Sequence, residues 1–340
     1  LAGYPFESLH ELLNSMAGSE DAERRRRAAL LLGHLEGCGN CSLIETLIAD
    51  QDNQVRKEAI RAAGMQKVAN TVPTIHKALA DPDPVIKETA IMALAEFGRN
   101  PAVMEDVLNL LGKYGESLDY AVIKSAGIMG TEQAGAVLME ELQKKQLSSN
   151  LVYPILETLG KISYKPVSEL IISHFLHHQD LDIRRLAVEV LGNFCDQNSL
   201  EGIQSVAHDP HWSVRITAIK ALVMIGGPLG TQNIMEALQD KDYLVRKQAI
   251  ISLGSLRDVK TISEIVKQLA DKEMNEFACE AILNFGRSAL PYLHRFMKRD
   301  GSHEIREKVI DLIGKIGESS SVVPLMELLE DPNPNIRLAA

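Results

Sequence analysis

The chain has 340 residues and a formal net charge of −10, and only 4% of its residues are aromatic. An acidic chain with few rings to stack on bases lacks the usual means of binding DNA or RNA, so we expect no nucleic-acid partner. Its four cysteines are too few for a disulfide scaffold of this length, and no apolar run approaches the eighteen residues of a membrane-spanning helix. We expect a cytoplasmic segment that does not insert into a membrane.

In chain order, an apolar run over residues 6–16 is followed by a ten-residue phrase that recurs about ten times. The phrase begins with an aliphatic residue and Arg, has a small or apolar residue at its fifth position and an apolar one at its ninth. The tenth positions are Gly33, Gly64, Leu94, Gly130, Gly160, Gly192, Val223, Gly254, Gly286 and Gly314. Residues four apart share one face of an α-helix, so each phrase predicts a helix, named helix A here.

A second helical pattern follows each phrase, for example over residues 72–80, 231–238 and 261–269, and predicts a helix B. An Asp–Pro corner then precedes the next phrase, as at Asp83-Pro84, where Asp suits the N-cap and Pro the first helical position. The unit is therefore helix A, loop, helix B, turn, and no strand is expected. Gly at the tenth position is expected to end helix A, or to let helix B of the same hairpin pack closely. The longest step, 36 residues from Leu94 to Gly130, predicts a local change of curvature.

This pattern resembles HEAT repeats, and in particular the short bacterial variety called phycobilisome-lyase-type HEAT-like repeats. The resemblance rests on the Asp–Pro corner, Val/Ile-Arg, Ala at the fifth position and Leu-Gly, and it covers essentially all 340 residues. It implies an all-α fold, a right-handed α-solenoid of about ten to eleven helical hairpins, with residues 1–340 forming a single domain. Because neither end supplies a polar capping repeat, we interpret the chain as a fragment of a longer one.

Arginines at the second phrase position could form either an anion-binding row or an Asp–Arg ladder between the corners of adjacent repeats. The second interpretation is favoured because the arginine recurs in unit after unit. These arginines are Arg56, Arg184, Arg215, Arg246, Arg306 and Arg337. The run from Arg24 to Arg27 is interpreted separately, as a solvated face screened by nearby acidic residues.

Two groups of residues have the chemistry to bind a metal. Cys38 and Cys41 have the spacing of a dithiol pair or of half a thiolate site, and His177, His208 and His211 lie at two consecutive corners. The first pair lacks further ligands nearby, and the histidines carry no implied geometry. We therefore expect no metal and no cofactor.

Enzymes built from such repeats make demands that this sequence does not meet. Deoxyhypusine hydroxylases carry His-Glu pairs at the third and fourth positions of helix A, where this chain has pairs such as Lys57-Glu58 and Lys247-Gln248. HEAT-like DNA glycosylases need a basic, aromatic groove. A bilin-lyase-like enzyme or chaperone of chromophore attachment is the alternative, on the resemblance of repeat type only.

We expect a non-catalytic scaffold that binds a protein or peptide, or another domain of the same chain, on a concave surface lined by the B helices. It would serve as a regulatory or interaction segment of a larger protein. The expected partner-binding residues are polar positions on the B helices: His76, Lys77, Glu105, Glu141, His174, Gln204, Gln232, Glu236, Lys267, His294 and Arg295.

Overall fold

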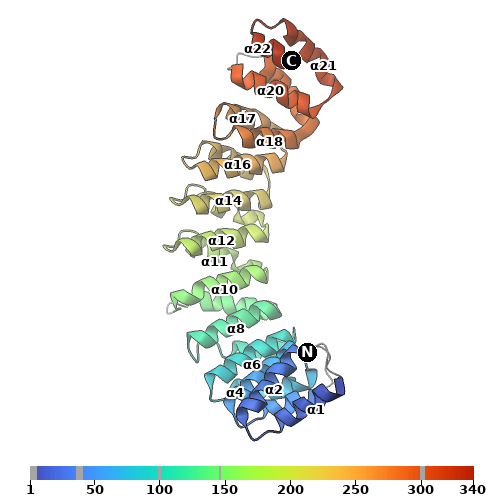
Figure 1. Cartoon of the computed structure of the whole chain (residues 1–340). Coiled ribbons are helices and arrows are strands. Elements are labelled where there is room, and N and C mark those ends of the chain that lie inside the picture. The colour runs from blue at the N-terminus through green and yellow to red at the C-terminus, as the bar shows by residue number, and fades with distance from the viewer. Residues whose placement is uncertain (1–5, 36–40, 99–100, 145–146, 299–302) are drawn as a thin grey trace. The chain divides into compact units, whose positions relative to one another are not determined.

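The computed structural model describes residues 6–35, 41–98, 101–144, 147–298 and 303–340, and within these ranges every regular element is helical. The chain forms two compact units, Leu1–Val167 and Ser168–Ala340, which are described separately. In both, the helices follow one another in chain order (Figure 1). None of the helices in the described ranges has the length and apolar character needed to span a bilayer.

In the first unit, A and B helices alternate. The A helices are α2 (Ala22–His34), α4 (Asn53–Met65), α6 (Pro84–Glu96), α8 (Glu116–Met129) and α10 (Ser149–Lys161). The B helices are α1 (Phe6–Ala17), α3 (Cys41–Ile48), α5 (Val72–Lys77), α7 (Pro101–Leu108) and α9 (Glu132–Leu142). Short 3-10 turns, such as η2 (Ala78–Ala80), extend some of the B helices.

The second unit repeats this alternation. Its A helices are α12 (Leu181–Phe194), α14 (Trp212–Ile225), α16 (Tyr243–Leu256), α18 (Asn275–Phe285), α20 (His303–Ile316) and α22 (Pro334–Ala339). Its B helices are α11 (Ser168–His174), α13 (Leu200–Ser205), α15 (Pro228–Glu236), α17 (Ile262–Lys267), α19 (Leu290–Lys298) and α21 (Val322–Met326). Within each unit, each A helix packs on the A helix of the next repeat, so the all-α solenoid is confirmed, with eleven A helices in the described ranges.

The predicted core positions are buried. Val55, Ala59 and Ala63, at the first, fifth and ninth positions of one phrase, are each fully inaccessible to solvent, as is Ile75 on the following B helix. Each hairpin therefore contributes one apolar stripe from each helix. Neither stripe could be buried by the hairpin alone, which is why the repeats stack.

The A helices begin at regular intervals, and this corrects the predicted phase in two repeats. Their N-caps are Asp21, Asp52, Asp83, Gly115, Ser148, Asp180, His211 and Asp242, which are 31 to 33 residues apart. Counted from these caps, the position equivalent to Gly64 is Ala95 in α6 and Gly127 in α8, not Leu94 and Gly130. The predicted 36-residue step is therefore wrong. Gly130 is instead the left-handed residue that ends α8 (φ 59°).

At several tenth positions the glycine packs against the next A helix, which neither predicted role anticipated, whereas Gly286 ends α18 as predicted (φ 54°). A Cβ on Gly64 would lie 2.9 Å from the Cα of Ala93 in α6, and one on Gly254 would lie 2.8 Å from the Cα of Ala281 in α18. Gly33 faces Ala62 and Gly192 faces Ala221 in the same way. The missing side chain thus sets how closely successive A helices approach, and helix B of the same hairpin is not the neighbour.

Gly254→Ala and Gly314→Ala form a matched pair, because both glycines lie in the same phrase position and only Gly254 meets a neighbour. Gly254→Ala should lower the free energy of unfolding by about 1–3 kcal/mol, since the new methyl must displace α18. Gly314→Ala should raise it by roughly 0.5–1 kcal/mol, because Ala favours the helix. Urea denaturation followed by circular dichroism measures both, and stabilisation by both substitutions would contradict the close contact.

Candidate functional site

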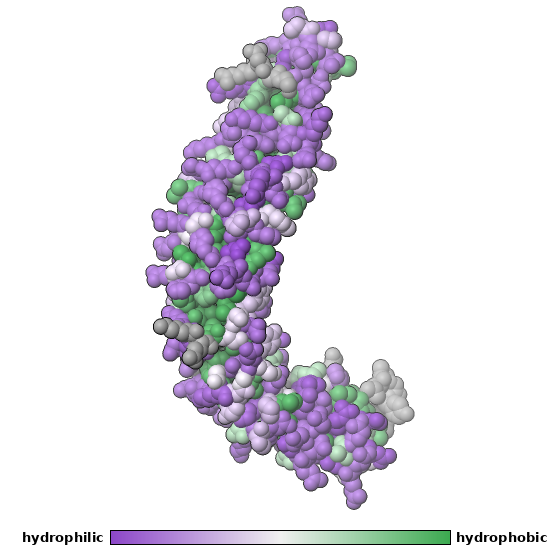
Figure 2. Space-filling model, turned by 90° about the vertical axis from the view of Figure 1, so that its left-hand side faces the viewer, coloured by the Kyte–Doolittle hydropathy of each residue, from purple (hydrophilic) through white to green (hydrophobic). Residues whose placement is uncertain are grey.

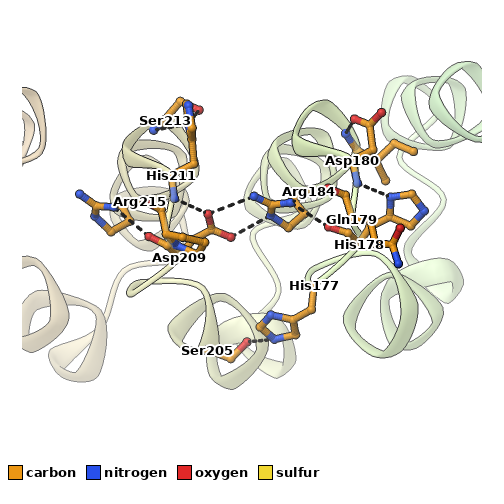
Figure 3. A network of polar contacts seen from close by, with 12 residues as sticks. His177, His178, Gln179, Asp180, Arg184, Ser205, Asp209, His211, Ser213 and Arg215 are labelled. Atoms are coloured by element: carbon orange, nitrogen blue, oxygen red, sulfur yellow. Dashed lines mark hydrogen bonds and ion pairs between the residues drawn. The ribbon is translucent and has the colours of Figure 1, made fainter.

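The predicted ladder arginines bind acidic residues at the corner of the following repeat, except Arg337, for which the structure shows only hydrogen bonds to carbonyls of its own corner. Arg184 Nε donates to Asp209 Oδ2 at 2.8 Å (Figure 3). In the next repeat, Arg215 Nε donates to Asp240 Oδ2 at 2.7 Å. The Nη1 of each arginine also donates to backbone carbonyls of its own corner, those of His178 and Gln179 for Arg184. Each guanidinium thereby ties two corners together.

The same arrangement recurs in both units, so the ladder interpretation is confirmed. The further pairs are Arg25–Asp50, Arg56–Asp81, Arg246–Glu273 and Arg306–Asp331. The acidic partner comes from the following repeat, whereas the acids that precede the arginines, such as Asp52 and Asp180, cap their own helices. Most of these pairs are well buried, with only 5% of the Arg215 side chain exposed.

Arg25 corrects the interpretation of the four-arginine run. It lies four residues after the N-cap of α2, is buried, and binds Asp50 through two hydrogen bonds. Arg26 and Arg27 both bind Glu23, and their hydrogen bonds lower the pKa of that carboxyl to about 2. These two and Arg24, which is exposed, fit the predicted solvated face.

The ladder is interrupted in the later repeats of the first unit. At the equivalent position, α6 has Lys87, whose Nζ lies 3.9 Å from the ring centre of Tyr114, and α8 has Asp119. Asp119 Oδ1 accepts a hydrogen bond from the Gly112 N–H at 2.6 Å. Burial raises the pKa of Asp119, and nearby Glu141 adds to the effect. A carboxylate at this position has no N–H group to donate to the acidic corner of the next repeat, so it cannot form the ladder contact.

The predicted partner-binding residues on the B helices do not converge on one site. Glu141 is buried and pairs with Lys144, so it is not available on the surface as predicted. His76 binds Asp106 at 2.7 Å and Lys267 pairs with Glu264 at 2.6 Å. Of the remaining members, Gln204 is half-buried and His294 forms a hydrogen bond with Ser321. Gln232 lines a hollow of about 460 Å³ beside the start of α15. The exposed members are Lys77, Glu105, His174, Glu236 and Arg295.

The histidines with metal-binding potential have other partners. His177 Nε2 lies 3.0 Å from Ser205 Oγ, and His211 caps α14 by accepting from the Ser213 N–H; the two lie on opposite sides of the Arg184–Asp209 pair in Figure 3. His208 is exposed. Within the described ranges, no three His, Cys, Asp or Glu side chains lie close enough to hold a metal ion. Cys38 and the side chain of Cys41 lie outside the described residues.

Solvent-facing grooves lie instead between successive A helices of the first unit. The largest of three, about 370 Å³, lies between α4 and α6; the others, of about 220 and 350 Å³, lie between α2 and α4 and between α8 and α10. Each contains a contact between a glycine of one A helix and a small residue of the next. The three contacts are Gly33 with Ala62, Gly64 with Ala93, and Gly127 with Thr158. Small residues at the contact leave room above it.

The edges of these grooves combine exposed apolar side chains with charges of both signs. Met65 is 49% exposed, Val85 42% and Leu30 41%, although each is large and apolar. Lys57 and Arg61 lie along the α4 side of the largest groove, and two glutamates lie along its α6 side. On the face of the molecule shown in Figure 2, hydrophilic side chains predominate and hydrophobic ones form separate patches. Exposed apolar residues that gather around a groove are typical of an interaction surface.

Sequence reasoning missed this surface because it assigned the repeated phrase to stacking alone. On the α4 wall of the largest groove, Lys57, Arg61 and Met65 occupy the third, seventh and eleventh positions of the phrase, between those that hold the stack. The third position changes chemistry from repeat to repeat, when the phase is taken from the helix N-caps: Lys57, Glu88, Tyr120, Tyr153, Arg185, Ile216 and Lys247. That variation within one chain was the available signal.

These features define a repeat scaffold of stacked helical hairpins. A sequence model of HEAT repeats matches residues 41–113, 168–254 and 262–340, which is more than half of the chain. The chain belongs to the HEAT repeat family. No curated protein matches its sequence.

Two Kap121p structures share the fold of this chain. A structure of Kap121p matches with a TM-score of 0.57 and 11% sequence identity, and the match covers 100% of this chain and 46% of the Kap121p chain. A Kap121p mutant with three acidic residues changed to lysine matches with a TM-score of 0.54 and 11% identity, and this match covers 96% of this chain and 44% of the mutant chain. An engineered protein has a TM-score of 0.44 at 16% identity over 97% of this chain and 96% of its own. The chain spans less than half the length of the Kap121p structures, and at this identity the likeness to Kap121p shows the fold alone.

Arg215→Ala tests the ladder. The substitution leaves the Asp240 carboxylate and the carbonyls of two corner residues without their donor, so it should lower the free energy of unfolding by about 3–5 kcal/mol. Arg185→Ala is the control, because that exposed arginine binds only Asp182 in its own helix and should contribute under about 1 kcal/mol. Equal losses in urea denaturation would contradict a structural role for the ladder.

Asp119→Asn should stabilise the protein at pH 7. A raised pKa in the folded state means that folding disfavours the charged carboxyl, so stability is lost as pH rises through that pKa. Asn keeps an acceptor for the Gly112 N–H without the charge. The gain should shrink as pH falls below about 4, where Asp119 is protonated in both states.

Asp331→Asn should behave in the opposite way, because the Arg306 hydrogen bond lowers the pKa of Asp331. Its stabilising effect is present above the ordinary pKa and is lost on acidification, so the substitution should destabilise at pH 7 and matter less near pH 3. Melting temperatures across this pH range check both signs. A shift of the same sign for the two variants would contradict the assigned environments.

Proposed function

We propose that this HEAT repeat chain is a non-catalytic scaffold that binds a protein or peptide segment on the outer face of its A helices. The observation that carries the proposal is the groove between α4 and α6, which combines volume, exposed apolar edges and charges of both signs. A groove of about 370 Å³ is at the lower end of ligand-pocket sizes and suits a few side chains of a docked segment.

The A-helix row is favoured over the B-helix row that the sequence suggested. Several B-row candidates already pair with neighbours, such as His76 with Asp106, and Glu141 is buried. Side chains that must first leave a partner contribute less to binding. Met65 and Val85, in contrast, expose apolar surface to solvent, and a partner that covered it would remove that surface from water.

The contacts of three partly buried carboxyl groups with shifted pKa values support a non-catalytic role. For Asp50 and Asp240, burial alone would raise the pKa, but hydrogen bonds from Arg25 and Arg215 outweigh it and lower the pKa. Asp119 binds the Gly112 backbone. All three are engaged in structural contacts, and none lines the grooves described above.

The repeats are inferred to be of the short phycobilisome-lyase type. This inference is supported by the spacing of 31 to 33 residues between A-helix caps and by the recurring Val/Ile-Arg and Leu-Gly pairs. It concerns the repeat alone and assigns no lyase activity.

Selection of a displayed library of random 16-residue peptides on the purified chain tests the proposal. Peptides that bind should lose at least tenfold in affinity to Met65→Glu, about 1.4 kcal/mol, because the charge would enter the apolar edge of the groove. Met224→Glu is the matched control, since Met224 lies at the same position of α14 and is equally exposed. Lys77→Glu controls for the B row.

The proposal predicts that both control variants keep their affinity within about twofold, a difference under about 0.5 kcal/mol. Failure to select any binding peptide would refute a peptide-binding role. Loss of binding to Lys77→Glu, with Met65→Glu unaffected, would place the site on the B row instead. Circular dichroism of each variant verifies that the helices are intact.

A further inference from the structure

Resting on the proposed function, we infer the chemistry of the partner: an amphipathic α-helix that lies across α2, α4 and α6. It carries two large apolar side chains seven residues apart, one for each groove. Acidic residues of this helix lie over Lys57 and Arg61, and basic residues lie over Glu88 and Glu96.

Two grooves meet along one ridge of α4. The groove between α2 and α4 and the groove between α4 and α6 share Arg61 and Met65 in their walls. One contains the contact of Gly33 with Ala62 and the other that of Gly64 with Ala93. A partner that crosses the A helices therefore meets a groove, a ridge and a second groove in succession.

The spacing of these grooves matches an α-helix. Packed helices lie about 8–10 Å apart, which sets the distance between neighbouring grooves. On a helix that rises about 1.5 Å per residue, side chains seven apart share one face and lie roughly 10.5 Å apart along the axis. Side chains of the intervening turn, three or four residues on, would then lie over the ridge at Met65.

The side chains at the ridge and edges suit an apolar stripe. Leu30 edges the first groove, Met65 forms the ridge and Val85 edges the second, and all three are exposed by more than two fifths. Methionine is flexible and polarizable, so it adapts to different apolar partners. A helix with one apolar stripe would cover these three side chains together.

The charges across α4 and α6 set the polarity of the partner. Lys57 and Arg61 lie on the α4 wall, and Arg61 Nη1 forms an ion pair with Glu58 Oε2 at 2.9 Å. Lys57 has no ion-pair partner among the described residues. Glu88 and Glu96 lie on the opposite wall. The Glu88 carboxylate accepts a hydrogen bond from the Ser117 hydroxyl, and Glu96 has no ion-pair partner among the described residues. The surface thus changes from basic to acidic in the direction of the crossing.

A focused display library tests this inference. Its members are 18-residue helical peptides with Leu, Met, Phe or Ile at two positions, spaced by five, six, seven or eight residues, and Glu, Lys, Gln or Ser elsewhere. Selection is performed on the wild-type chain and on Lys57→Glu/Glu96→Lys, which exchanges the two unpaired charges. Lys77→Glu/Glu105→Lys, on exposed positions of α5 and α7, is the matched B-row exchange.

Wild type and the B-row exchange should both enrich the seven-residue spacing with one acidic and one basic end. The Lys57→Glu/Glu96→Lys variant should enrich the reversed charge order, and each selected peptide should prefer its own bait at least tenfold in fluorescence anisotropy. Circular dichroism should show added helix when a synthetic peptide binds.

The outcomes separate this inference from the proposed function. Peptides that bind and are lost on Met65→Glu, but show no preference for spacing or charge order, overturn the helical partner and leave the proposed function in place. No enrichment from either library refutes both. If the chain instead self-associates in light scattering, and Met65→Glu abolishes that association, the occupant is a second copy and the inference is wrong.

Discussion

The contact between successive A helices is the constraint on which the rest of this structure depends. Where Gly64 faces Ala93, and Gly254 faces Ala281, there is no room for even one more methyl group. This close approach brings the N-terminal corners of successive A helices within reach of each other, so an arginine of one repeat can bind an acidic residue of the next. The ladder also forms from α14, which has Val223 at the tenth position, and from α20, where Gly314 meets no neighbour. The regular start of each A helix, 31 to 33 residues after the last, follows from the same repeated contact.

The ladder converts this packing into a directional link. Arg215 is almost fully buried, donates to Asp240 ahead of it, and donates to the Asp209 carbonyl of its own corner. A buried ion pair of this kind adds little net stability compared with apolar packing, but it is costly to break, so it specifies which corners meet. The interruption at Lys87 and Asp119 shows that stacking continues without the link. Apolar burial, at positions such as Val122, therefore carries the stack there.

The candidate binding surface is a consequence of the same small residues. A glycine that lets two helices approach also leaves a hollow above the contact, and the walls of that hollow are the phrase positions that stacking does not constrain. Those positions can vary without disturbing the core, which is why Lys57, Glu88 and Tyr120 occupy equivalent places. Stability and the proposed recognition thus depend on different residues of one phrase. A scaffold of this design can change its partner by substitutions that leave its fold intact.

The sequence by itself determined the all-α solenoid, the alternation of A and B helices and the Arg–Asp ladder, because each depends on a period that recurs along the chain. It could not determine the phase where the phrase is degenerate, so the pattern predicts Leu94 and Gly130 at the tenth position, where the structure has Ala95 and Gly127. Nor does the pattern distinguish the buried Arg25 from the exposed arginines beside it. Only the tertiary structure decided which helix faces Gly64, that Glu141 is buried, and that grooves lie along the A row. The physical reason is that these properties depend on the distance between helices of different repeats, and a one-dimensional pattern contains no such distance.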